Sequence, residues 1–226
     1  MIRNDLDQYL KKYIEGYLLA DLKTIHEKVS VSGNGSASLG NLGYLFTIAI
    51  CSAMEFLGLL LREDSPVKEG KINASNAMSH YVKHYLEPID SRYAAFRAVG
   101  TQLIRNGISH TYATKGNIAI TRKGGRATTH LIKYGKDGVF VLNPDCLYED
   151  FLLSYEKLKQ FIASDEEFRV KINVHYEAIR GVYTEEVNRT VQGLDGIEWI
   201  DKDDGYVTSV DIIDYLEREG VPYETS

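Results

Sequence analysis

Apolar residues recur at intervals of three and four along much of the chain, and this spacing predicts a largely helical protein. The pattern first covers residues 5–28 and resumes after a glycine- and serine-rich loop as an almost unbroken apolar run at 41–62. A periodic segment at 74–86 stops just before a proline, which cannot sit inside a helix, and another spans 91–106. The first of these helices carries its larger apolar side chains at Leu6, Tyr9, Leu10, Tyr13, Tyr17 and Leu18.

The apolar run at 41–62 has two interpretations. Its length approaches the roughly 20 residues that cross a bilayer as a helix. Glu55 lies well inside the run, however, and a lone carboxylate is costly in lipid. No second apolar segment accompanies it. We therefore expect the central helix of a bundle, buried on most of its sides.

Between residues 117 and 143 the spacing changes from helical to alternating. The sequences NIAITRK, THLIKYG and VFVLN are separated by a GG pair and by KDG, which predicts a three-stranded antiparallel meander. Helical spacing returns at 145–163 and 166–190. The elements together predict a mainly α fold, a helical bundle with an inserted small antiparallel β-meander (α+β) and an acidic C-terminal tail.

The domain organisation follows from these elements and from a shift in charge. We expect one helical domain at 1–190, with the meander inserted at about 116–143, and an acidic appendage at 191–226. From residue 195 to the end there are ten acidic and two basic residues. The apolar fraction of 44% and the charged fraction of 26% are those of an ordinary soluble protein.

Cysteine and tyrosine usage add two expectations. Cys51 and Cys146 lie in apolar helical patterns without partners at metal-ligand spacing, which favours buried thiols in a reducing cytoplasm. The charged amino terminus lacks the apolar region of a secretory signal, so we expect a cytoplasmic protein. Sixteen tyrosines are many for 226 residues, and they can serve either in the core or as stacking surfaces.

Basic residues are concentrated in one part of an otherwise acidic chain. The net charge is −6, yet the segment from Ser91 to Lys136 holds nine basic residues and no acidic one. A segregated positive surface attracts polyanions even when the whole protein is negative, so RNA is the expected partner. The alternative is a solvated hairpin that happens to be rich in lysine and arginine. The candidate RNA-binding residues are Arg97, Lys115, Arg122, Lys123, Arg126, His130 and Lys133.

The stretch IRNGISHTY at 104–112 lies inside this basic segment and suits phosphodiester chemistry. A histidine takes up or gives a proton near neutral pH, and an arginine stabilises the charge of a phosphorane, so Arg105 and His110 are the candidate catalytic residues. Asn106 is a candidate for orienting them. We expect Gly107 to end the helix, so that the chain reverses and His110 folds back beside Arg105. If the helix continues instead, the two side chains diverge by about 140° and a second subunit is needed.

The hexapeptide Arg105-Asn106-Gly107-Ile108-Ser109-His110 resembles the Arg-x(4–6)-His signature of the HEPN superfamily, in which a polar residue commonly follows the arginine. Tyr112 extends the match to Arg-x4-His-x-Tyr. This longer form is typical of HEPN toxins whose nucleotidyltransferase antitoxin adenylylates the tyrosine. The meander and the acidic tail are additions relative to the simplest members.

The resemblance implies a metal-independent endoribonuclease in a toxin–antitoxin or anti-phage defence setting. It implies a homodimer in which two motifs meet, no cofactor, and cleavage through attack by the RNA 2′-hydroxyl. A nucleotidyltransferase-like antitoxin would be a further partner. The alternative function is a non-catalytic HEPN module that binds RNA, a nucleotide or a protein partner, and a plainer one is a helical scaffold.

Three further features each have a functional and a structural interpretation. Glu55 either orients Arg105 in the site or is simply a buried partner for an arginine or a tyrosine hydroxyl. Arg169 and His175 repeat the arginine–histidine spacing, but in the middle of a predicted helix. His80 and His84 have the spacing of zinc ligands on a helix, yet no third ligand is identifiable, so we expect no metal site.

Overall fold

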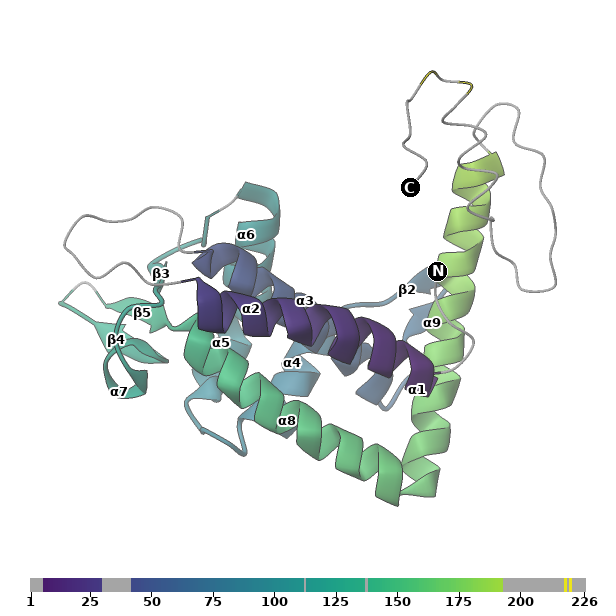
Figure 1. Cartoon of the computed structure of the whole chain (residues 1–226), viewed down its shortest axis with the longest axis horizontal. Coiled ribbons are helices and arrows are strands. Elements are labelled where there is room, and N and C mark those ends of the chain that lie inside the picture. Colours follow the sequence, from purple (N-terminus) through teal and green to yellow (C-terminus); the bar gives the residue numbers. More distant parts are fainter. Residues whose placement is uncertain are drawn as a thin grey trace.

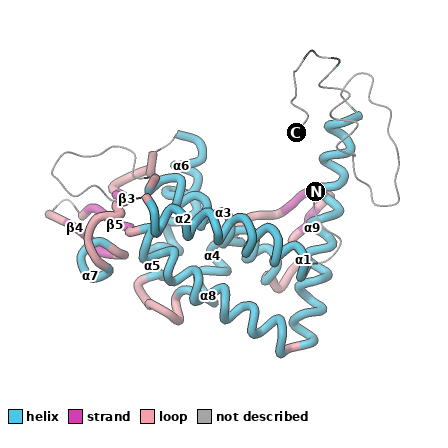
Figure 2. The backbone as a smooth tube through the Cα atoms, in the orientation of Figure 1, coloured by secondary structure: helices cyan, strands magenta, loops and turns pink. Residues whose placement is uncertain are grey.

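A computed structural model of the chain shows a mainly helical fold with two small β-sheets (Figure 1). The larger sheet lies at one end of the helical body and the last long helix lies at the other (Figure 2). The expectation of a mainly α protein with a small inserted sheet is therefore confirmed. The structure describes residues 6–29, 42–111, 113–136 and 138–192, together with Arg218 and Gly220.

The amino-terminal pattern forms one continuous rod built of α1 (Leu6–Tyr9), η1 (Leu10–Leu19) and α2 (Ala20–Lys28). The η segments are π-helices, in which each backbone N–H bonds to the carbonyl five residues earlier. The helix predicted at 5–28 is confirmed. Its buried face is made by aliphatic residues, whereas its tyrosines lie at the edge of that face or outside it. The buried side chains are Leu6, Leu10, Ile14 and Leu22.

The apolar run forms α3 (Gly43–Leu61), and the next elements are a small hairpin and a short helix. The hairpin pairs β1 (Val67–Lys68) with β2 (Lys71–Ile72) in a stretch that lacks alternating apolar residues. The helix consists of α4 (Ala77–Tyr81) and η2 (Val82–Leu86), as predicted for 74–86. It passes so close to α3 that a Cβ on Gly58 would lie 2.0 Å from the carbonyl oxygen of Ala77.

The helix that carries the Arg–His motif does not end at Gly107. It runs through α5 (Tyr93–Val99) and η3 (Gly100–Arg105) into α6 (Asn106–Thr111). The expectation of a chain reversal at Gly107 is wrong. The glycine is instead required by close packing, because a Cβ there would lie 2.6 Å from the carbonyl oxygen of Ala113. The returning chain crosses at this point, and the Lys115 N–H donates to the Leu103 carbonyl at 2.8 Å.

The inserted sheet has a different topology from the predicted meander. Its central strand is β5 (Val139–Leu142), which pairs in parallel with β3 (Ile118–Ile120) and antiparallel with β4 (Ile132–Tyr134). A helical turn, α7 (Arg126–Thr129), occupies part of the predicted middle strand. This turn carries the chain across to the far side of β5, so β3 and β4 never pair. Only the β4–β5 hairpin of the predicted meander is present.

Two long helices complete the described chain. The first, α8 (Pro144–Ser164), has Asn143 as its N-cap, and the Asn143 side chain accepts a hydrogen bond from the Asp145 N–H at 3.0 Å. The second, α9 (Glu166–Gln192), agrees with the helix predicted at 166–190. The appendage expected at 191–226 lies outside the described residues, apart from the end of α9, Arg218 and Gly220.

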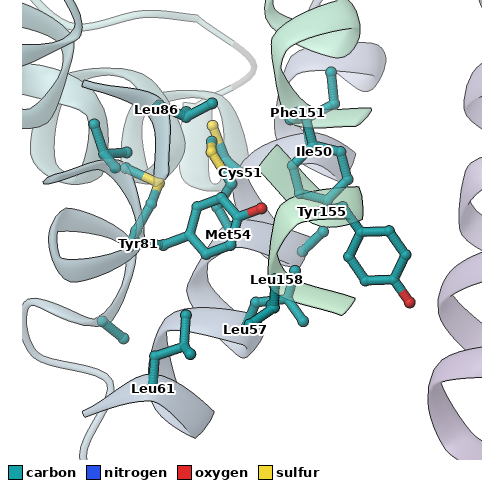
Figure 3. Packing of buried hydrophobic residues seen from close by; sticks show 14 of the residues in the cluster. Ile50, Cys51, Met54, Leu57, Leu61, Tyr81, Leu86, Phe151, Tyr155 and Leu158 are labelled. Carbon is teal, nitrogen blue, oxygen red and sulfur yellow. The ribbon is translucent and has the colours of Figure 1, made fainter. Parts of the chain in front are cut away.

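The core is organised around α3, which contacts η3, α4, α8 and α9. In Figure 3, Ile50 and Leu57 of α3 lie beside Phe151 and Leu158 of α8. By length and composition alone α3 is a candidate membrane span, but most of its side chains are enclosed by the other helices. Such enclosure is the arrangement of a core helix.

Candidate functional site

Arg105 is held at the junction of η3 and α6 by two polar partners. Its Nη2 donates to Glu55 Oε1 of α3 at 3.0 Å, and its Nη1 donates to Asn106 Oδ1 at 3.1 Å. The Arg105 side chain is 29% exposed and that of Glu55 is 16% exposed. The ion pair with Arg105 fits both interpretations of Glu55, since the structural one also expects an arginine or a tyrosine hydroxyl as the partner. The Glu55 carboxylate neutralises the half-buried charge of Arg105 and fixes the position of its guanidinium.

The Arg105 guanidinium has donor capacity beyond these two contacts. An arginine offers five N–H donors, and its Nε here is buried without a hydrogen-bond partner among the described residues. A buried donor without a partner is costly, and such a group in a folded protein calls for an explanation.

Cys51 of α3 lies near Arg105 but is no candidate nucleophile. Burial raises the pKa of its thiol to about 12, so this cysteine stays protonated.

His110 lies exposed on α6, one turn beyond Asn106. Because α6 is a regular α-helix, Arg105 and His110 point about 140° apart around its axis. Viewed down the helix axis, Asn106 lies between Arg105 and His110. Its side chain accepts a hydrogen bond from the Arg105 guanidinium. One chain therefore does not bring Arg105 and His110 together as predicted.

The second arginine–histidine pair with this spacing, Arg169 and His175, does not expose its histidine. His175 on α9 is buried, with its Nδ1 2.9 Å from the Leu60 carbonyl, and burial lowers the pKa of its imidazole. Arg169 pairs instead with Asp7 of α1 at 2.9 Å. This arrangement ties α9 to the amino-terminal rod and to α3. Arg169 and His175 therefore hold helices together and form no candidate catalytic site.

The basic segment separates into exposed lysines and paired arginines. The lysines Lys115, Lys123 and Lys133 are exposed and remain candidates for contact with an RNA backbone. Arg97 is half-buried and forms an ion pair with Glu87. The positive charge predicted from the sequence is therefore partly neutralised by carboxylates that lie outside the segment.

Arg122 is a buried structural residue, so the prediction that it binds RNA is wrong. Its side chain is 2% exposed. It donates to both oxygens of Asp145 at 2.9 Å and to the carbonyls of Ile25 and Val29 at 3.0 and 3.1 Å. The guanidinium thus binds the carbonyl end of α2 and joins the inserted sheet to the amino-terminal rod.

His130 is likewise inaccessible to substrate. It is completely buried, with Nδ1 3.1 Å from the Asn143 carbonyl and Nε2 3.1 Å from the Tyr93 hydroxyl. Burial, reinforced by the nearby Arg126 charge, lowers the pKa of the imidazole to about 4. The prediction that His130 contacts RNA is wrong, because the strand begins only at residue 132 and the chain before it turns inward.

Arg126 belongs to the same buried network through Asp150 of α8. Its Nη1 and Nη2 donate to the two oxygens of Asp150 at 2.6 and 2.9 Å. The Tyr93 hydroxyl donates to Asp150 Oδ2 at 2.7 Å. Asp150 is 2% exposed and joins α5, α7 and α8. Sequence reasoning missed it, because a single acidic residue on a predicted amphipathic helix carries no sign of a buried partner.

Tyr112, the expected modification site, lies outside the described residues. Within the described part of the chain, no three histidine, cysteine, aspartate or glutamate residues gather closely enough to hold a metal ion. The rings of His80 and His84 lie tilted against each other, with their centroids 4.5 Å apart. Comparisons with protein-family models, with curated proteins and with solved structures gave no match.

Proposed function

We propose that the protein is a metal-independent endoribonuclease of HEPN type that acts as a homodimer in a toxin–antitoxin or anti-phage defence setting. One observation carries the proposal. An arginine that is fixed by Glu55 and Asn106 keeps 29% of its side chain exposed, and an exposed histidine lies about one turn further along the same helix. The Arg-x4-His motif, whose spacing predicted this chemistry, thus lies at a helix end that is exposed to solvent.

The reaction requires an acid, a base and a group that stabilises negative charge. His110 of one copy takes the proton from the RNA 2′-hydroxyl, whose oxygen bonds to phosphorus and forms a pentacovalent phosphorane. Arg105 stabilises the additional negative charge on the equatorial oxygens. The bond from phosphorus to the 5′-oxygen then breaks, and His110 of the second copy, which enters protonated, gives its proton to that oxygen. The products are a 2′,3′-cyclic phosphate and a 5′-hydroxyl.

Two copies are needed because one helix cannot supply this set of groups. Arg105 at the end of η3 and His110 on α6 diverge around the helix axis, and the motif contains a single histidine. A two-fold axis close to α6 would place both histidines and both arginines around one phosphodiester. Asn106 and Glu55 then act as positioning residues for Arg105.

The test is RNA cleavage in the presence of EDTA, with analysis of the product ends. We expect cleavage with 2′,3′-cyclic phosphate ends and a loss of about 10²- to 10³-fold in rate for Arg105→Ala, the usual cost of removing a transition-state donor. Arg169→Ala is the matched control, because it removes an exposed arginine from the other Arg–His spacing. Absence of cleavage by the wild type, or equal rates for Arg105→Ala and Arg169→Ala, refutes the proposal.

The alternative is a non-catalytic module that binds RNA, a nucleotide or a protein partner. The ion pair with Glu55 favours it, since this carboxylate already neutralises the guanidinium that the reaction requires. A module of this kind binds RNA without cutting it. Binding by a wild-type protein that leaves the RNA intact would therefore select this alternative.

A further inference from the structure

Three tyrosines follow one another at four-residue spacing along the amino-terminal rod. The ring centroids of Tyr9 and Tyr13 are 5.0 Å apart, and those of Tyr13 and Tyr17 are 5.8 Å apart. Exposure increases along this tyrosine row, from the half-buried Tyr9 and Tyr13 to Tyr17, which is 55% exposed. A large aromatic ring held in solvent beside other rings is unusual, because most tyrosines bury their ring.

A lysine accompanies the outer part of the tyrosine row. Lys12 Nζ lies 5.3 Å from the centroid of the Tyr13 ring and 6.0 Å from that of Tyr17. These distances are within the range of cation–π contacts. A half-buried lysine beside partly exposed aromatic rings is a combination with which proteins bind single-stranded nucleic acids, with phosphates near the lysine and bases on the rings.

The inner end of the tyrosine row lies next to the Arg105 site. The Tyr9 ring packs on Phe56, with centroids 5.1 Å apart, and Phe56 directly follows Glu55, the partner of Arg105. Tyr183 of α9 is near the same place, since burial, Glu186 and then Glu55 raise the pKa of its phenol. The row thus begins at a ring that packs on the residue following Glu55 and continues along η1.

The part of the basic segment that lies in and around the inserted sheet is a weaker candidate for the substrate path. Arg122 and His130 are buried, and Arg126 is bound to Asp150 by two hydrogen bonds. Its exposed lysines attract phosphates, but Tyr134 is its one large exposed apolar side chain among the described residues. Electrostatic attraction without stacking rings gives RNA affinity but no defined path for single-stranded bases.

We propose that Tyr13 and Tyr17, with Lys12, form a stacking platform for single-stranded RNA that leads into the Arg105 site. This inference rests on the proposed function, because it assigns the path of that site's substrate. Glu186 places negative charge at the Tyr183 end, whereas Lys12 lies toward Tyr17. We therefore expect the strand to leave the site in the direction of Tyr17. Stacking is tolerant of sequence, so the platform binds unpaired bases of any kind.

The experiment measures the binding of a fluorescein-labelled 12-nucleotide oligouridine by fluorescence anisotropy, at low salt with EDTA. His110→Ala serves as the background so that the RNA stays intact. Adding Tyr17→Leu or Tyr13→Leu should raise Kd by about fivefold or more each, because one stacked base contributes on the order of 1–3 kcal/mol. Tyr17→Phe keeps the ring and should bind as the background does. Tyr134→Leu, which removes a tyrosine that is 66% exposed on β4, is the matched control and should have no effect.

The platform is refuted if Tyr13→Leu and Tyr17→Leu leave Kd within twofold, if Tyr134→Leu weakens binding as much, or if the oligouridine does not bind. It is also refuted if Tyr17→Leu converts a dimer to a monomer in light scattering, since the row would then be a subunit interface. Cleavage assays separate this inference from the proposed function. Wild-type cleavage with normal binding by the tyrosine variants refutes only the platform, whereas tyrosine-dependent binding without cleavage refutes only the ribonuclease.

Discussion

Replacing His110 with alanine is expected to lower the rate of RNA cleavage by about 10²- to 10⁴-fold, the usual contribution of a positioned general acid or base. The proposed dimer uses this residue twice, as base and as acid, so one substitution removes both roles. His110 is exposed on α6 and takes no part in the core. The variant should therefore unfold at the temperature of the wild type and bind the oligouridine with the same Kd.

The control for this prediction is His84→Ala. His84 is also exposed, lies on η2 and contacts another histidine, His80. Single-turnover cleavage rates of both variants, together with their thermal unfolding temperatures, separate catalysis from stability. Equal rates for His110→Ala and the wild type would remove the imidazole from the mechanism, whatever the state of Arg105.

Replacing Asp150 with alanine is expected to lower the free energy of unfolding by about 3 kcal/mol, the lower end of the cost of breaking a buried ion pair, since Asp150 is buried but Arg126 is 36% exposed. Asp150 accepts hydrogen bonds from Arg126 and from Tyr93, and the variant leaves these donors only their longer contacts, to Glu149 and the Cys146 carbonyl and to His130. The inserted sheet should loosen first, since Arg126 in α7 joins it to α8. Urea unfolding followed by far-UV circular dichroism measures the effect.

Glu149→Ala provides the matched control. Glu149 precedes Asp150, is 54% exposed and lies 3.4 Å from the same Arg126. Exposed ion pairs contribute about 0–1 kcal/mol, so this variant should stay close to the wild type. Similar losses in the two variants would show that burial of Asp150 does not determine the stability of the network.

The helices were predictable because their apolar spacing is regular and long. The segments at 5–28, 41–62 and 145–163 agree with the structure to within a few residues. Gly107 misled the prediction, since a glycine needed for close packing and a glycine that ends a helix look alike in a sequence. Only the crossing chain at Ala113 distinguishes them, and that contact is not local.

The sheet and the basic segment show a second limit of sequence reasoning. Strand pairing depends on connections, and the turn at α7 places β3 beside β5 although alternation alone favours sequential pairing. Likewise, a count of charges does not reveal that Arg122 and Arg126 have acidic partners on α8. A partner for Glu55 was foreseeable, because a lone carboxylate in an apolar helix requires one, and an arginine was among the expected partners.

The central claim is that two copies of α6 build one catalytic site, and a mixing experiment tests it most directly. Wild-type protein is allowed to exchange subunits with an excess of the His110→Ala variant, and the cleavage rate per wild-type chain is measured. Because mixed dimers contain a single His110, we expect this rate to fall to about one half at a 1:1 ratio and to about a tenth at tenfold excess. A rate per wild-type chain that does not change with added variant, while light scattering shows mixed dimers, would contradict the account.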